Sequence, residues 1–210
     1  MWKPVDTEFF FPLLPVSLVG LTGGGGIDRT VLEKLGCLVL SHSPGTPLDF
    51  LRILGQGNTA PRYMIISGHA DPAGLWFGKF GKSVDSRQHE MLVDELLPPQ
   101  AIRDHVNLPG CTILSGSCHG GTPELAKAYL AGGVAAYIGA RKAVGFSLHV
   151  FLTHFFFCVI RKGMTDRCAW EAAVRAVDDD DTWSLSYWHS DGREERLERT
   201  PSGAPGESGR

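Results

Sequence analysis

The sequence has no large excess of charge of either sign. Its 20 Lys and Arg residues nearly balance its 23 Asp and Glu residues, which leaves a formal net charge of -3. Proteins that bind nucleic acid through its phosphates usually carry a strongly basic surface, and this composition does not supply one. We therefore expect no nucleic-acid partner.

Closely spaced cysteines are also lacking. The cysteines form no CxxC pair and are dispersed along the chain, at Cys37, Cys111, Cys118, Cys158 and Cys168. An odd, dispersed set disfavours a disulfide framework and a zinc site, and is typical of reduced thiols in the cytosol. We expect a cytoplasmic protein without a bound metal, in which four of these thiols pack in the core.

No apolar run is long enough to cross a bilayer. Residues 146–160, FSLHVFLTHFFFCVI, form the most hydrophobic window, but they number about 15 where roughly 20 are needed. The apolar start of the chain has no basic region and is interrupted by Pro12 and Pro15, which disfavours a secretory signal. The sequence predicts a buried helix at 146–160 and no membrane partner.

A phosphate-binding glycine motif is missing as well. The run TGGGG at 22–26 lacks the Lys-Ser/Thr ending of a phosphate loop and does not match GxGxxG. We interpret it as a flexible loop, and we expect no nucleotide or other cofactor.

What the sequence does contain is a series of short apolar segments bounded by Gly or Pro. They are rich in β-branched and aromatic residues, as strands covered on both faces are. They lie at 36–42, 62–68, 111–117 and 134–140, and an additional first strand within 8–20 stays open. Helical patterns occur at 46–55, 100–108, 122–133, 146–162 and 166–177. The helix at 122–133 has its own start signals, with Thr122 as N-cap and Pro123 at the first helical position.

This alternation of strands and helices predicts an α/β fold, a three-layer α/β/α sandwich with a mainly parallel central sheet. We expect one domain over residues 1–190. The segment 74–85, GLWFGKFGKSVD, is expected to form an inserted hairpin. The tail 191–210 has no apolar periodicity and ends rich in Gly, Ser and Pro, so we expect it to be disordered.

Two of the predicted strands end in side chains suited to nucleophilic chemistry. The strand at 62–68 delivers His69, and the strand at 111–117 delivers Cys118. Ligands gather at the carboxyl ends of parallel strands, so neighbouring strands can bring this imidazole close to this thiol. A nearby histidine raises the thiolate fraction of a cysteine or takes its proton directly. A lone cysteine here is more often core, but the pair favours catalysis.

Glycines surround both residues. We expect them to leave room for a substrate backbone, while the backbone N–H groups of Ala70 and Cys118 form an oxyanion hole. The glycines are Gly68, Gly116, Gly120 and Gly121. His119 is a poor base for Cys118, because adjacent residues at a strand end point apart. We expect it to line the cleft or to cap the following helix.

These blocks resemble a known family. IISGHA (65–70) and SGSCHGG (115–121) are similar to the two catalytic blocks of caspase-like cysteine peptidases of clan CD, the second particularly to that of metacaspases. The runs at 124–144 and 166–176 resemble the stretches that follow the cysteine in CHAT-type members, so the resemblance covers roughly residues 60–178. A histidine about 50 residues before the cysteine also fits caspases.

The resemblance implies a caspase-like fold and an endopeptidase with a Cys–His dyad, acting on a protein or peptide substrate. Cys118 would attack the scissile carbonyl to form a thioester, and His69 would be the base for the thiol or the acid for the leaving amine. We expect substrate contacts at Gly68, Gly116 and His119, and control by a separate activating protein partner.

Two positions depart from the family pattern. Ala70 replaces the glycine that follows the histidine, and Gly116 replaces the metacaspase aspartate that helps to bind a basic residue on the amino side of the scissile bond (P1). A preference for Arg or Lys at P1 therefore does not carry over. Arg141 and Lys142, at the end of the strand at 134–140, are expected either to receive an acidic P1 side chain or to be solvated loop charges.

The sequence contains two other acidic features. Asp71 is interpreted as a surface residue rather than one that orients a loop. The run Asp178–Asp181 lacks the alternating ligand spacing of a calcium loop, so a helix end in solvent is the favoured interpretation.

Two other functions compete. Residues 116–120 fit the G-x-nucleophile-x-G elbow of α/β-hydrolases of the dienelactone-hydrolase type, with Cys118 as nucleophile. That fold needs a histidine after the nucleophile, which leaves His149, His154 or His189, and the first two lie within an apolar helix. The other alternative is a caspase-like interaction module that has lost its activity.

Overall fold

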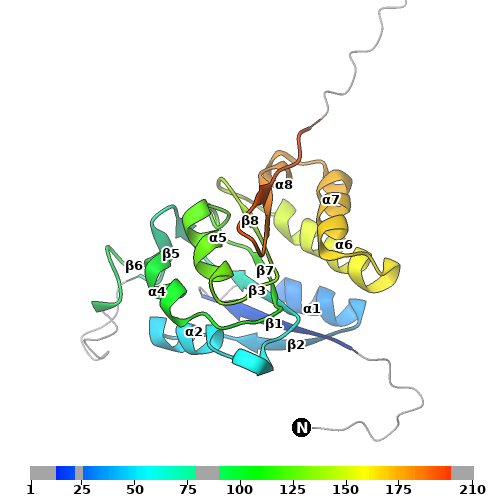
Figure 1. Cartoon of the computed structure of the whole chain (residues 1–210). Helices are drawn as coiled ribbons and strands as arrows, with labels where there is room; N and C mark the ends of the chain where they lie inside the picture. The colour runs from blue at the N-terminus through cyan, green and yellow to red at the C-terminus, as the bar shows by residue number, and fades with distance from the viewer. Residues whose placement is uncertain (1–12, 22–25, 79–89, 200–210) are drawn as a thin grey trace, which may run out of the picture.

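The central sheet explains why the chain is rich in short apolar strands. The computed structural model describes residues 13–21, 26–78 and 90–199. Seven strands lie in the order β10-β9-β8-β7-β3-β1-β2 (Figure 1). Neighbouring strands from β2 to β8 run parallel, whereas β9 pairs antiparallel with both β8 and β10. The strands are β1 (Leu14–Gly20), β2 (Cys37–His42), β3 (Tyr63–Ser67), β7 (Thr112–Ser115), β8 (Ala136–Ala140), β9 (Leu185–His189) and β10 (Glu194–Glu195).

Helices cover both faces of this sheet. One face packs against α1 (Gly26–Leu35), α6 (Ser147–Lys162) and α7 (Asp166–Val177), and the short α8 (Asp180–Trp183) follows α7. The other face packs against α2 (Pro47–Leu54), α4 (Pro99–His105) and α5 (Pro123–Leu130). A 3-10 turn spans Gly57–Thr59. The predicted α/β/α sandwich with a mainly parallel sheet is confirmed (Figure 1).

Side chains of β3 show how one strand serves both layers. Tyr63 and Ile65 belong to the core beneath α6 and α7, whereas Met64 and Ile66 belong to the core beneath α2 and α5. All four are almost completely buried. Since successive residues of a strand point to opposite faces, a strand covered twice must be apolar throughout.

The helix boundaries follow the capping signals. Thr46 precedes α2, and its side chain accepts a hydrogen bond from Asp49 N at 3.2 Å. Gly163 ends α6 in the left-handed conformation, with φ of 62°. Thr122 is the N-cap of α5, as predicted, although its side chain makes no capping hydrogen bond.

Two expectations need correction. The hairpin begins earlier than residue 74: β4 (Ala70–Asp71) pairs with β5 (Gly74–Trp76), which pairs with β6 (Leu96–Leu97) in a small antiparallel sheet. Residues 79–85 of the predicted hairpin lie outside the described residues. The prediction of a disordered tail was wrong for Glu194–Glu195, because these residues form β10 against β9.

The acidic run Asp178–Asp181 lies at a helix end in solvent, as expected, because Asp178, Asp179 and Asp180 are exposed. Asp178 ends α7, and Asp179 caps α8 through a hydrogen bond from Asp181 N at 2.8 Å. The run therefore forms the turn between α7 and α8.

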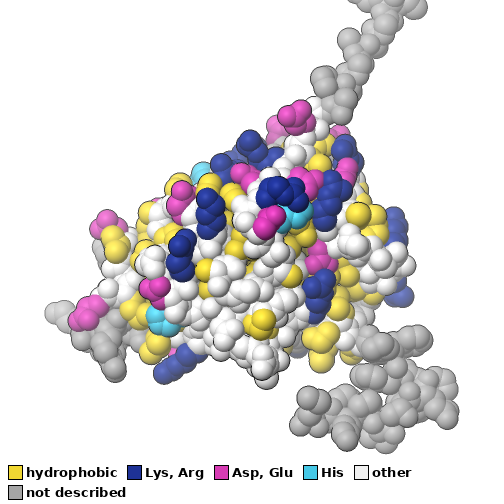
Figure 2. Space-filling view, viewed as in Figure 1, with side chains coloured by type: hydrophobic (Ala, Val, Ile, Leu, Met, Phe, Trp, Pro, Cys, Tyr) yellow, Lys and Arg dark blue, Asp and Glu magenta, His cyan; other side chains and the backbone are white. Residues whose placement is uncertain are grey.

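Acidic and basic side chains are mixed on the surface. Figure 2 shows both signs close together near the sheet edge that β9 and β10 form, where Arg167 pairs with Glu195 and Arg141 lies 3.7 Å from Glu194. Within the described residues, no helix has both the length and the apolar character needed to span a bilayer.

Candidate active site

The two predicted catalytic residues follow neighbouring parallel strands. β3 pairs directly with β7, with Ile66 opposite Ser115. The chain continues past β3 through Gly68 to His69, and past β7 through Gly116 to Cys118. Both side chains are therefore carried to the same edge of the sheet, where parallel sheets bind ligands.

A cavity of about 310 Å³ lies at this edge. Four of the predicted site residues line it together: Gly68, His69, Gly116 and Cys118. The rest of its wall comes from Ser67, from Asp28 on α1, and from the loop and first two turns of α6 at Val144, Gly145, Leu148, His149 and Leu152. The imidazole and the thiol thus share one crevice.

Cys118 has a different environment from the other cysteines. It is half-buried, and its Sγ donates a long hydrogen bond to the Val144 carbonyl oxygen at 3.8 Å. Cys37 and Cys111 are buried in the core, and burial raises the pKa of these thiols to about 11 and about 12. A thiol with so high a pKa is almost entirely protonated at neutral pH and is a poor nucleophile.

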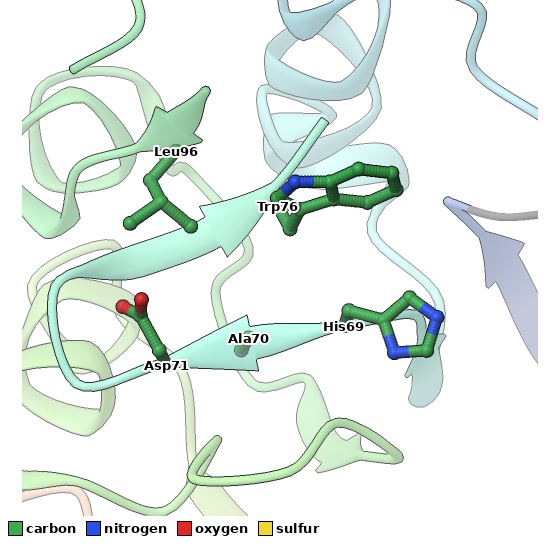
Figure 3. Close-up of a pocket in the computed structure, with 5 residues that line it drawn as sticks. All are labelled: His69, Ala70, Asp71, Trp76 and Leu96. Atoms are coloured by element: carbon green, nitrogen blue, oxygen red, sulfur yellow. The ribbon is translucent and has the colours of Figure 1, made fainter. Parts of the chain in front are cut away.

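His69 lies between two hollows. It lines the cavity of Cys118, and it also lines a shallower hollow with Ala70, Asp71, Trp76 and Leu96 (Figure 3). Its ring packs edge-on against Trp76, with ring centroids 6.0 Å apart, and its backbone carbonyl accepts from Trp76 N at 2.9 Å. These contacts hold the imidazole at the rim that separates the two hollows.

Asp71 is more than a surface residue, which corrects the prediction. Its Oδ1 accepts hydrogen bonds from Ala73 N at 2.7 Å and from Gly74 N at 3.2 Å. The carboxylate therefore shapes the turn between β4 and β5 and, through it, the position of Trp76 beside His69 (Figure 3).

The glycines after Cys118 have a packing role that no sequence signal indicated. A Cβ on Gly121 would lie 2.1 Å from the Gly139 carbonyl oxygen of β8, and a Cβ on Gly120 would lie 2.2 Å from Ser115 Oγ. Neither residue lines the cavity. We expected both to make room for a substrate, but they make room for the neighbouring backbone and side chain of the sheet.

His119 is turned away from the cavity. It has a left-handed backbone with φ of 55°, its N–H donates to the Lys142 carbonyl oxygen at 3.0 Å, and its Nδ1 lies 3.3 Å from the Arg141 carbonyl oxygen. It is not among the residues that line the cavity, and Thr122 caps the helix α5. Neither expected role of His119 matches this placement.

Arg141 and Lys142 also lie outside the cavity lining. Arg141 is 3.7 Å from Glu194, and its Nη1 donates to the Gly121 carbonyl oxygen at 3.5 Å. Lys142 Nζ is 3.9 Å from Asp181. Both cations are partly exposed and have acidic partners within the chain, so the alternative of solvated loop charges fits better than that of a receptor for an acidic P1 side chain.

A polar contact in the cavity wall, between Asp28 and His149, was not foreseen. Asp28, in the first turn of α1, lies with Oδ1 2.6 Å from Nδ1 of His149, in the first turn of α6. The Asp28 side chain is only 4% exposed, whereas that of His149 is 37% exposed. The apolar helix pattern suggested a buried setting for His149. The two residues are 121 positions apart, and no sequence signal connects them.

Sequence comparison identifies no relative: no family model and no curated protein matches this chain. Among solved structures, the chain is similar to the Arg-specific cysteine proteinase gingipain R, with 13% identity, a TM-score of 0.50, and coverage of 82% of this chain and 46% of that one. A structure of the pro- and mature domains of RgpB from Porphyromonas gingivalis matches with 13% identity, a TM-score of 0.48, and coverage of 81% and 46%.

A zymogen of a C11 protease from Parabacteroides distasonis matches with 12% identity, a TM-score of 0.43, and coverage of 85% of this chain and 62% of that one. The chain thus spans about half the length of the gingipain chains. The likeness to gingipain R shows a shared fold, which confirms the expected caspase-like architecture.

Proposed function

We propose that the protein is a cysteine endopeptidase in which Cys118 is the nucleophile and His69 is the general acid and base. The observation that carries this proposal is that both side chains line one cavity, from the ends of two paired parallel strands. The fold shared with a cysteine proteinase adds support. The substrate is a protein or peptide.

The chemistry would proceed in two halves. Cys118 Sγ attacks the scissile carbonyl carbon, and the resulting oxyanion accepts hydrogen bonds from the backbone N–H groups of Cys118 and Ala70. His69 takes the thiol proton and passes it to the leaving amine, so that the C–N bond breaks and a thioester forms. A water molecule then attacks the thioester, gives its proton to His69, and releases the carboxylate product and the thiol.

The α/β-hydrolase alternative fits the local backbone less well. A nucleophile elbow places its nucleophile on a sharp, strained turn. Here the left-handed residue is His119, one position later, and Cys118 is not among the non-glycine residues with positive φ in the described part of the chain. His189 pairs with Glu195 at 3.1 Å on the edge strand β9 and does not line the cavity.

The test compares histidine and cysteine variants in a peptide-library cleavage assay. We expect Cys118→Ala and His69→Ala each to lower kcat/KM by about 1000-fold or more, because removal of either dyad member leaves only binding and oxyanion stabilisation. His154→Ala, in the middle of α6 at a residue that does not line the cavity, and Cys168→Ala, at an exposed thiol, are the matched controls and should retain activity. Full activity in His69→Ala, or activity that survives in Cys118→Ala, would contradict the proposal.

A further inference from the structure

The wall of the Cys118 cavity contains a carboxylate that already has a hydrogen-bonding partner. Asp28 is more deeply buried than His149, and a 2.6 Å contact between its Oδ1 and the imidazole Nδ1 joins α1 to α6 at this wall. With Nδ1 engaged by Asp28, Nε2 is the nitrogen of His149 that is left for other groups. His149 is the more exposed of the two and is therefore the member of the pair that is more accessible to a side chain entering the cavity.

Apolar side chains from α6 and the loop before it form another part of the wall. Val144, Leu148 and Leu152 line it, and the last two are 8% and 4% exposed. A volume of about 310 Å³ is near the lower limit for ligand sites, so the cavity suits one side chain rather than a large ligand. Its position beside Cys118 makes that side chain the one next to the attacked carbonyl.

The charges of the lining residues limit what this side chain can be. Among the described residues that line the cavity there is no Lys or Arg, so an acidic side chain would be buried without a fixed cation. A basic side chain would need the Asp28 carboxylate, but His149 already binds its Oδ1. Burying a charge without a free partner costs more than burying a neutral group that forms hydrogen bonds.

We propose, on the basis of the proposed peptidase function, that the Asp28–His149 pair makes this cavity a P1 subsite for an uncharged amide side chain, Gln or Asn. Such a side chain places its methylene groups against Leu148 and Leu152. Its amide can donate to or accept from the imidazole Nε2, whichever form the imidazole takes. His149 thus shields Asp28 and keeps basic side chains out.

The shielding has a direct consequence. Replacing His149 by Ala removes the group that occupies Asp28 and leaves a buried carboxylate at the end of an apolar cavity. That variant should acquire a preference for Arg or Lys at P1. His149→Gln is the matched control, because its amide can still donate a hydrogen bond to Asp28 and should retain the wild-type preference.

The experiment measures the rate at which peptidyl electrophiles with Gln, Asn, Arg, Asp or Leu at P1 label Cys118, followed by intact mass spectrometry with Cys118→Ala as blank. Rates are divided by the rate with iodoacetamide, which corrects for thiol reactivity. We expect wild type to react with the Gln or Asn probe at least about tenfold faster than with Arg or Asp. In His149→Ala the Arg/Gln ratio should rise about tenfold or more, and in Asp28→Asn/His149→Ala it should fall back.

The failures of the two proposals are distinguishable. If wild type prefers Arg or Asp, or if His149→Ala leaves the Arg/Gln ratio unchanged, the P1 proposal is wrong and the peptidase proposal stands. If no peptidyl probe labels Cys118 faster than iodoacetamide does, both are wrong. Should the double variant fail to fold, the comparison of His149→Ala with His149→Gln decides alone.

Discussion

At the scale of single residues, the cysteine thiols differ in their solvent exposure. Burial raises the pKa of Cys37 to about 11 and that of Cys111 to about 12, so at pH 8 only about one in a thousand or fewer of these groups is a thiolate. Cys118 is half-buried in a cavity, and Cys168 is exposed. We expect limiting iodoacetamide at pH 8 to label Cys118 and Cys168 and to spare Cys37 and Cys111, as measured by peptide mapping.

The controls follow from the same contrast. Cys118→Ala should remove one label and Cys168→Ala the other, while unfolding in urea should expose all thiols to the reagent. Labelling of Cys37 as fast as that of Cys118 would show that the core opens on the time scale of the reaction, and it would remove the distinction on which the choice of nucleophile depends.

At this scale, a residue could be placed from the sequence when it directly follows a recognisable strand. His69 and Cys118 each follow a recognisable strand, so their meeting at one sheet edge followed from the pairing of strands. Asp28 and His149 were missed, because their contact depends on how α1 packs against α6, and neither segment carries a pattern that specifies this. The partners of Arg141 and Lys142 lie on β10 and α8, two elements that were not predicted.

At the scale of elements, one carboxylate joins α7 to the sheet. Asp166 is 8% exposed and accepts hydrogen bonds from Tyr63 at 2.6 Å, from Thr112 at 2.5 Å and from Arg62 at 3.0 Å. Its negative charge and the burial of the phenol raise the pKa of Tyr63 well above its ordinary value, burial being the larger cause. The first turn of α7 is thereby attached to the amino ends of β3 and β7.

Removing this carboxylate should therefore loosen α7. We expect Asp166→Ala to lower the free energy of unfolding by about 2–4 kcal/mol, because two buried hydroxyls and a half-exposed guanidinium lose their acceptor. Urea denaturation followed by circular dichroism measures the change. Glu33→Gln, at an exposed ion pair with Arg29, is the control and should change stability by less than about 0.5 kcal/mol. An equal effect of both variants would show that the Asp166 network adds nothing beyond a surface pair.

Most of the apolar strands bounded by Gly or Pro were predictable, whereas β9 and β10 were not. The strands β2, β3, β7 and β8 follow their apolar runs closely. β9 was missed because it contains Ser186 and His189 among its apolar residues and follows a charged turn. β10 consists of Glu194 and Glu195, and no propensity scale favours a strand there; it forms because β9 offers it an open edge.

At the scale of the whole molecule, ion pairs and hydrogen bonds between charged side chains stabilise the edge of the sheet at β10. Arg167 of α7 donates to Glu195 of β10 through Nε at 3.0 Å and through Nη2 at 2.5 Å, and His189 of β9 lies 3.1 Å from the same carboxylate. The hydrogen bond with Arg167 is the main cause that lowers the pKa of Glu195 from its ordinary value of 4.5. The last strand, the edge of the sheet and a covering helix therefore meet at one ionised group.

A lowered pKa makes this contribution to stability depend on pH. It is fully present above the unfolded-state pKa and is lost as the pH falls through the lower pKa of the folded state. We expect Glu195→Gln to cost about 1 kcal/mol at pH 7, a modest value because the carboxylate is partly exposed, and we expect the gap to wild type to close as the pH falls below about 4. Urea midpoints measured from pH 7 to pH 3 test this, with the exposed Glu198→Gln as control. A gap that stays constant down to pH 3 would mean that the folded-state pKa is not lowered, and that packing of β10 rather than the charge of Glu195 holds the end of the sheet.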